Sequence, residues 1–268
     1  MRLDADRRGA TRIFYGGAPQ DFGDLRLPRA AGPLPVVVVI HGGFWRALYD
    51  LEYIEPLCDA LTDAGVATWN IEYRRLGNPG GGYPGTFHDV ASAIDHLREI
   101  APAQGLDLSR VATLGHSAGG HLAVWAAARH RIPNDNPILP RDSAPFALRA
   151  AISLAGVVDL NASWTYHLSN QVVEEFVGGA PAEFPERYAV GSPMELLPLG
   201  VKQVLVHGTE DENVPFEISR AYHAAALARG DDVTLITLRG AGHFECVDPR
   251  SREWSAVKNA VLSSLGLE

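Results

Sequence analysis

Short apolar runs that alternate with helical patterns are the feature that most constrains the fold of this chain. The helical patterns place apolar residues three and four positions apart, as Leu51, Ile54 and Leu57 do after the capping residue Asp50. Near-continuous Val, Ile and Leu content is typical of parallel strands that helices cover on both faces. The clearest runs are Val36–Ile40, Val66–Glu72, Val111–Leu114, Ala150–Leu154, Gln203–Val206 and Val233–Leu238. The pattern therefore predicts an α/β fold with a mostly parallel, twisted sheet.

Two further runs precede these, and their pattern differs. Arg12–Tyr15 and Asp24–Leu27 are predicted to form an antiparallel hairpin at the sheet edge, which gives about eight strands. Thr86 and Asp89 have the spacing of a capping box and predict the start of the helix that follows. The length of 268 residues and the lack of a linker predict a single α/β domain over residues 1–268.

One part of the chain interrupts the alternation. Residues 131–148 are rich in proline, and residues 160–199 mix aromatic and apolar residues with Pro and Gly. We expect these segments to form an insertion of a few short helices, a small lid over the C-terminal edge of the sheet, where open α/β sheets bind ligands. An ordinary long connection is the alternative.

The run Gly115–Gly120 (GHSAGG) directly follows the strand Val111–Leu114 and leads into an apolar helical stretch. This is the G-x-S-x-G nucleophile elbow in its strand–turn–helix context, where a tight, strained turn lifts the hydroxyl of Ser117 clear of the sheet. A serine hydroxyl becomes a good nucleophile only when a base removes its proton and an acid orients that base. The elbow therefore predicts a base and an acid further along the chain.

The acid and the base are expected after later strands, in the chain order Ser, Asp or Glu, His. Asp211 follows the strand Gln203–Val206 and is the predicted acid, with three carboxylates as competitors. His243 lies in a glycine-rich loop after the last strand and is the predicted base. The competing carboxylates are Glu210, Glu212 and Asp159.

The segment His41–Trp45 (HGGFW) directly follows the strand Val36–Ile40. Acyl transfer passes through an oxyanion that needs backbone N–H donors, and paired glycines let the backbone approach closely. The predicted oxyanion hole uses the amides of Gly43 and Phe44 together with that of Ala118. His41 is expected to hold this loop by hydrogen bonding. The residues predicted to line the substrate pocket are Trp45, His116 and Phe244.

Composition narrows the possible partners. A formal net charge of −9 argues against nucleic acid or an anionic membrane surface as a main partner. Two cysteines give no disulfide framework, and the ten histidines lack metal-ligand spacing, so we expect no metal and no cofactor. The charged N-terminus lacks the apolar core of a signal peptide, and no run is long enough to span a bilayer. The chain is predicted to be cytoplasmic, with a homodimer possible.

Taken together, these residues resemble the α/β-hydrolase superfamily over nearly the whole chain. HGGFW, Glu72-Tyr73-Arg74, Tyr83-Pro84 before His88-Asp89-Val90, GHSAGGHLA, and Tyr15-Gly16 with Asp24-Leu25 and Pro28 resemble its arylformamidase (kynurenine formamidase)-like branch and the related carboxylesterases. The resemblance implies Ser117 as nucleophile, Asp211 as acid, His243 as base and the Gly43 region as oxyanion hole. Phe44 departs from the HGGG pattern of hormone-sensitive-lipase-like esterases, which argues against a lipase of that type.

The sequence thus predicts a cofactor-independent serine hydrolase that cleaves a small carboxylic ester or an aryl amide through an acyl-enzyme. A formamidase requires a cramped acyl pocket, whereas an esterase tolerates acetyl or butyryl groups. Two other possibilities stay open at this point: a non-catalytic ligand-binding protein of the same fold, and an acyltransferase that uses the same triad.

Overall fold

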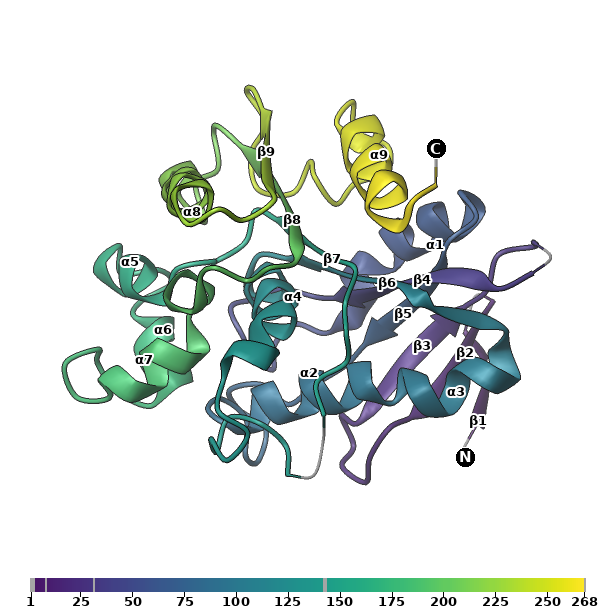
Figure 1. Cartoon of the computed structure of the whole chain (residues 1–268), viewed down its shortest axis with the longest axis horizontal. Helices are drawn as coiled ribbons and strands as arrows, with labels where there is room; N and C mark the ends of the chain where they lie inside the picture. Colours follow the sequence, from purple (N-terminus) through teal and green to yellow (C-terminus); the bar gives the residue numbers. More distant parts are fainter. Residues whose placement is uncertain (1–2, 8, 31, 142–143, 268) are drawn as a thin grey trace.

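A nine-stranded sheet forms the centre of the computed structural model, which describes residues 3–7, 9–30, 32–141 and 144–267 (Figure 1). The strand order is β1-β2-β3-β5-β4-β6-β7-β8-β9. Strands β4 to β9 are parallel, whereas β1, β2 and β3 form an antiparallel edge that joins β5. The strands are β1 (Leu3–Arg7), β2 (Ala10–Phe14), β3 (Phe22–Arg26), β4 (Leu34–Ile40), β5 (Ala67–Ile71), β6 (Leu106–His116), β7 (Ala150–Leu154), β8 (Lys202–Gly208) and β9 (Val233–Leu238).

This sheet confirms the predicted mostly parallel architecture, and all eight predicted strands are present. The ninth, β1, was not predicted. Its sequence, LDADR, carries two aspartates, a residue type that is depleted in strands. Backbone pairing with β2, in which Leu3 lies opposite Ile13, makes it a strand. Strand β1 therefore depends on its neighbour and not on its own side-chain pattern.

Helices cover both faces of the sheet (Figure 1). Successive residues of β4 are buried in two different cores, because the side chains of a strand alternate between its faces. Val37 and Val39 belong to the core that includes residues of α1 and α9, and Val36 and Val38 belong to the core that includes residues of α2, α3, α4 and α8. The helices of the two layers are η1 (Leu51–Ile54), α1 (Glu55–Asp63), α2 (Gly85–Asp95), α3 (Leu97–Gln104), α4 (Ala118–Ala128), η2 (Arg129–Arg131), α8 (Phe216–Ala228) and α9 (Trp254–Leu265).

The predicted capping box at the start of α2 is wrong. Helix α2 begins at Gly85 after Pro84, with no side-chain cap. The Thr86 hydroxyl instead donates to the carbonyl of Arg74, and both oxygens of Asp89 bind the Arg74 guanidinium. The two side chains therefore tie α2 to the end of β5, a tertiary role that the local spacing does not reveal.

The segment predicted to be a lid contains the short helices α5 (Leu160–Thr165), α6 (Val172–Val177), α7 (Pro185–Gly191) and η3 (Pro193–Leu196). They gather at one end of the sheet, coloured green in Figure 1. Arg46, in the loop after β4, binds Glu175, and the N–H of Tyr83 donates to the carbonyl of Phe176. The helices thus pack against the loops that follow β4 and β5. Within the part of the chain that the structure describes, no helix is long and apolar enough to cross a membrane.

Candidate active site

The elbow residue Ser117 lies between β6 and α4 with a left-handed backbone, φ 57° and ψ −120°. Its N–H donates to the carbonyl of Leu154 at the end of β7, 2.8 Å away, which fixes the turn to the neighbouring strand. A Cβ on Gly119 would lie 2.1 Å from the carbonyl oxygen of Ile40. The first turn of α4 therefore approaches β4 as closely as only glycine allows, and this contact holds Ser117 at the edge of the sheet.

The structure brings Asp211 and His243 together from the ends of β8 and β9. His243 Nδ1 donates to Asp211 Oδ2 over 2.7 Å, which leaves Nε2 as the ring nitrogen that a serine proton can reach. His243 and Ser117 line the same cavity. No hydrogen bond joins these two side chains among the described residues, and such contacts often tighten only when substrate is bound.

Asp211 receives more donors than His243 alone. Its Oδ1 accepts the N–H groups of Asn213 and Val214, and its Oδ2 also accepts from His207 Nε2 at 3.1 Å. Burial opposes ionisation of this carboxyl, but the hydrogen bonds from His207 and His243 outweigh it, so the pKa of Asp211 lies well below its ordinary value. Asp211 is therefore an ionised acceptor that fixes the orientation of His243.

The three competing carboxylates have surroundings that differ from those of Asp211. Glu210 and Glu212 are exposed, and the Oδ1 of Asp159 accepts the N–H of Ala162 as the N-cap of α5. The hydrogen bonds therefore favour Asp211 as the partner of His243.

A cavity of about 330 Å³ opens around Ser117. Its walls are largely aromatic and come from the loop after β4, from η1 and from the loops after β8 and β9. The lining residues are Gly43, Phe44, Tyr49, Tyr53, His116, Ser117, Asn213, His243 and Phe244. None of the described residues of segments 131–148 and 160–199 lines it.

The predicted oxyanion loop follows β4 and has an unusual backbone. Gly43, Phe44 and Trp45 have φ values of 105°, 52° and 54°. Three successive residues of positive φ persist only when their surroundings hold them. A Cβ on Gly43 would lie 2.5 Å from the Cβ of Tyr49, so this position needs glycine for space as well as for conformation. Gly43 and Phe44 line the cavity, and the buried Ala118 follows Ser117 at the start of α4.

Trp45 does not line the cavity, and the prediction that it contacts substrate is corrected here. Its side chain is fully buried and stacks on Phe176 of α6, with ring centroids 4.4 Å apart and an interplanar angle of 13°. Its carbonyl accepts the N–H of Leu76, 2.7 Å away. Trp45 therefore anchors the oxyanion loop in the core through its contact with Phe176.

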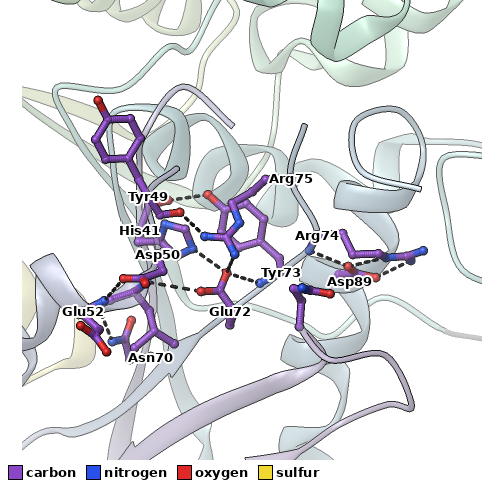
Figure 2. Close-up of polar contacts among 12 residues, drawn as sticks. His41, Tyr49, Asp50, Glu52, Asn70, Glu72, Tyr73, Arg74, Arg75 and Asp89 are labelled. Atoms are coloured by element: carbon purple, nitrogen blue, oxygen red, sulfur yellow. Dashed lines mark hydrogen bonds and ion pairs between the residues drawn. The ribbon is translucent and has the colours of Figure 1, made fainter. Parts of the chain in front are cut away.

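A buried polar network joins the segment that follows β4 to the residues that follow β5 (Figure 2). At the end of β5, Glu72 Oε1 lies 3.0 Å from His41 Nε2 and 3.1 Å from Arg75 Nη2, and it accepts the N–H of Tyr73. Burial disfavours the charge on Glu72, but His41 and Arg75 more than compensate, so its pKa is lowered. Arg75 also donates to the carbonyl of Tyr49. The network thus ties His41, directly after β4, and Tyr49, further along the same loop, to the residues that follow β5.

The other two predicted pocket residues do line the cavity. Phe244 is 59% exposed and lies at the rim, whereas His116 is buried and makes two hydrogen bonds. Sequence reasoning did not select Tyr49, Tyr53, Asn213, His207 or Glu72. Of these, Glu72 stood in a quoted motif and His207 four residues before Asp211, whereas no local signal marks Tyr49 or Tyr53.

The described residues also bear on metal-ligand clusters and on the state of the two thiols. Among the described residues, no group of three or more His, Cys, Asp or Glu side chains is arranged to hold a metal ion. Both cysteines are free and buried, and burial raises the pKa of Cys58 to about 12 and that of Cys246 further still. Cys246 lies beside the His243 loop, where its Sγ is 3.4 Å from the His243 carbonyl.

A model of the BD-FAE family matches residues 24–226, a stretch that runs from β3 to α8 and includes the elbow and the predicted acid. The chain belongs to this family. Esterase LipQ of Mycobacterium tuberculosis is 31% identical over 200 residues, which are 73% of this chain and 46% of LipQ. The probable isoprenylcysteine alpha-carbonyl methylesterase ICME of Oryza sativa is 27% identical over 240 residues, 87% of this chain and 57% of that protein. This BD-FAE chain thus spans about half the length of the curated relatives it matches.

Solved structures resemble this BD-FAE chain over nearly its whole length. A truncated carbohydrate esterase from gut microbiota has a TM-score of 0.79 at 21% identity, with 95% of each chain covered. Thermogutta terrifontis esterase 2, phosphoramylated by tabun, has a TM-score of 0.78 at 21% identity and covers 99% of this chain and 98% of its own. At this level of identity the likeness bears on the fold, and it confirms the predicted α/β-hydrolase fold.

Proposed function

We propose that this chain is a serine carboxylesterase that cleaves small esters. One observation carries the proposal: Ser117 in a strained elbow faces the same cavity as His243, which is hydrogen-bonded to the buried Asp211 over 2.7 Å. The relatives that are named esterases support the same reaction class. The proposed reaction needs neither a metal nor another cofactor.

In the proposed mechanism, His243 Nε2 takes the proton of the Ser117 hydroxyl as Oγ attacks the ester carbonyl. The negative oxygen of the tetrahedral intermediate accepts hydrogen bonds from the Ala118 amide and from the amides of Gly43 and Phe44. The C–O bond to the leaving group breaks, and protonated His243 gives its proton to the departing alkoxide. Water, deprotonated by His243, then attacks the acyl-enzyme, and the acid leaves as Ser117 regains its proton.

The cavity supports a small substrate with an apolar or aromatic group. Its volume is about 330 Å³, and the rings of Phe44, Tyr49, Tyr53 and Phe244 form much of its wall. Aromatic rings pack well against flat apolar groups at offset or edge-on angles. We therefore propose short acyl esters of aryl or alkyl alcohols as substrates.

The arylformamidase-like activity is a second proposal, which the aromatic walls favour because the leaving group of such a substrate is an arylamine. Comparing formyl, acetyl and butyryl esters of one phenol tests how large an acyl group the site takes. A sharp preference for formyl, with turnover of N-formylkynurenine, supports the formamidase. Equal rates on the three esters would argue for a general esterase.

The central test is hydrolysis of p-nitrophenyl acetate by wild type and by Ser117→Ala. Without the nucleophile, the expected loss in kcat is about 10⁴-fold or more. Ser109→Ala is the matched control, because Ser109 is an exposed residue of β6 near the opposite end of the strand from the elbow. Turnover that persists in Ser117→Ala would overturn the proposal, and so would a wild type without turnover of any ester in the series.

A further inference from the structure

Three linked hydrogen bonds join four segments of the polypeptide around Ser117. The N–H of Gly42 donates to the Tyr53 hydroxyl over 2.6 Å. That hydroxyl lies 3.0 Å from Nδ1 of His116, and Nε2 of His116 lies 2.9 Å from the backbone carbonyl of His243. The bonded residues therefore come from the oxyanion loop, from η1, from the residue before Ser117 and from the loop of the base.

The direction of these bonds follows from their ends. A carbonyl oxygen only accepts, so His116 Nε2 carries the proton and donates to His243. In a neutral imidazole Nδ1 is then the acceptor, and the Tyr53 hydroxyl donates to it. Burial is the main cause, and the neighbouring His243 a smaller one, that lowers the pKa of His116 to about 3. The ring is therefore neutral at the pH of an ester assay. Every donor among these hydrogen bonds thus has an acceptor.

These hydrogen bonds also affect which backbone amides can donate to the oxyanion. The Gly42 N–H is occupied by Tyr53, so the amides available in this loop are those of Gly43 and Phe44. A Cβ on Gly42 would lie 2.9 Å from the Tyr53 hydroxyl and 2.6 Å from the carbonyl oxygen of His116. The oxyanion loop is therefore in close contact with Tyr53 and His116, and its position depends on the position of the Tyr53 hydroxyl.

We infer that Tyr53 and His116 are positioning residues for the proposed esterase reaction: they hold the oxyanion loop and the His243 loop in register on either side of Ser117. This role adds to the predicted substrate-pocket role of His116, and it rests on the proposed function. Since oxyanion donors and a general base act over tenths of an ångström, a shift in either loop lowers the rate of the chemical step. It affects substrate binding less.

The test is Tyr53→Phe, which keeps the ring on the cavity wall and removes both hydrogen bonds. We expect kcat for p-nitrophenyl acetate to fall about tenfold or more while KM stays within about twofold. Tyr188→Phe is the control, because its buried hydroxyl donates to the carbonyl of Gly179 in the α5–α7 region and does not line the cavity. That variant is expected to keep the wild-type kcat.

His116 provides a second pair of variants. His116→Gln retains a donor for the His243 carbonyl and an acceptor for Tyr53, whereas His116→Leu retains neither. We expect the glutamine variant to keep more of kcat than the leucine variant. A change confined to KM in Tyr53→Phe, or an equal loss of kcat in Tyr188→Phe, would overturn the positioning role of Tyr53 and His116. A wild type without Ser117-dependent hydrolysis would overturn the proposed function itself, and the two failures are therefore distinct.

Discussion

The two sides of the cavity around Ser117 are held in place by different chemistry. On the side of β8 and β9, one carboxylate, Asp211, receives His243, His207 and two backbone N–H groups. On the side of β4 and β5, Glu72 is buried between His41 and Arg75, and Trp45 stacks in the core. The first arrangement orients one ring, whereas the second holds the backbone of a whole loop.

This difference predicts how each side responds to substitution. A change at Asp211 should damage the chemistry first, because His243 then loses the acceptor that orients its ring. A change at Glu72 should damage the fold first, because two cationic or polar partners and a strained loop depend on its charge. The predictions that follow test this contrast, from the largest expected effect on activity to the smallest, and end on a stability test of the second side.

Asp211→Asn is expected to lower kcat for p-nitrophenyl acetate by about 10⁴-fold. An amide in this position favours the wrong tautomer of His243 and does not stabilise the imidazolium that forms when His243 takes the serine proton. Steady-state kinetics at several pH values measure the loss. Glu212→Gln is the control, since Glu212 is exposed beside Asp211, and a comparable loss in that variant would contradict the assignment of the acid.

Glu72→Gln is expected to cost about 3–5 kcal/mol in the free energy of unfolding at pH 7, because Arg75 then keeps a buried charge without its partner. A tenfold or smaller fall in kcat should accompany it as the oxyanion loop shifts. Urea unfolding and ester kinetics of the same preparations measure both effects.

The stability effect of Glu72 should depend on pH in a defined direction. Folding lowers its pKa below the ordinary 4.5, so the ionised carboxylate stabilises the fold above that pH. This contribution is lost as the pH falls through the lowered, folded-state pKa. The difference between wild type and Glu72→Gln should therefore be largest at pH 7 and shrink below about pH 4.5. A difference that grows on acidification would contradict the ion pair.

Phe244→Ala is expected to have the smallest effect, a rise in KM for an aryl ester of about fivefold or less. The residue is 59% exposed at the rim of the cavity, so its removal takes little buried apolar surface from the fold. Its contact with a bound aryl group should contribute about 1 kcal/mol to binding. Kinetics with phenyl and ethyl acetate separate this contact from a general effect, because only the phenyl ester should respond.

Trp45→Ala provides the contrast on the other side of the cavity. This side chain is fully buried against Phe176, and its loss should cost about 3–5 kcal/mol in the free energy of unfolding. Thermal or urea unfolding measures it. Unchanged stability together with an altered KM in Trp45→Ala would instead support the predicted contact between Trp45 and substrate.

Local constraints are what the sequence alone determined. The six near-continuous apolar runs predicted the parallel strands, because burial on both faces leaves a direct mark on composition. GHSAGG between a strand and a helix predicted the strained serine, since a tight turn against β4 leaves room only for glycine. Chain order and strand ends selected Asp211 and His243, which the structure joins by a hydrogen bond.

The tertiary structure decided which side chains meet. Tyr53 and His116 are 63 residues apart, and His116 and the His243 carbonyl 127, so no local spacing marks their contact. Trp45 and Phe244 both adjoin site residues in the sequence, yet one is core and the other rim, because Trp45 packs on Phe176 of the distant helix α6. Sequence patterns record what each segment buries, whereas the partners of a buried polar group depend on how distant segments pack.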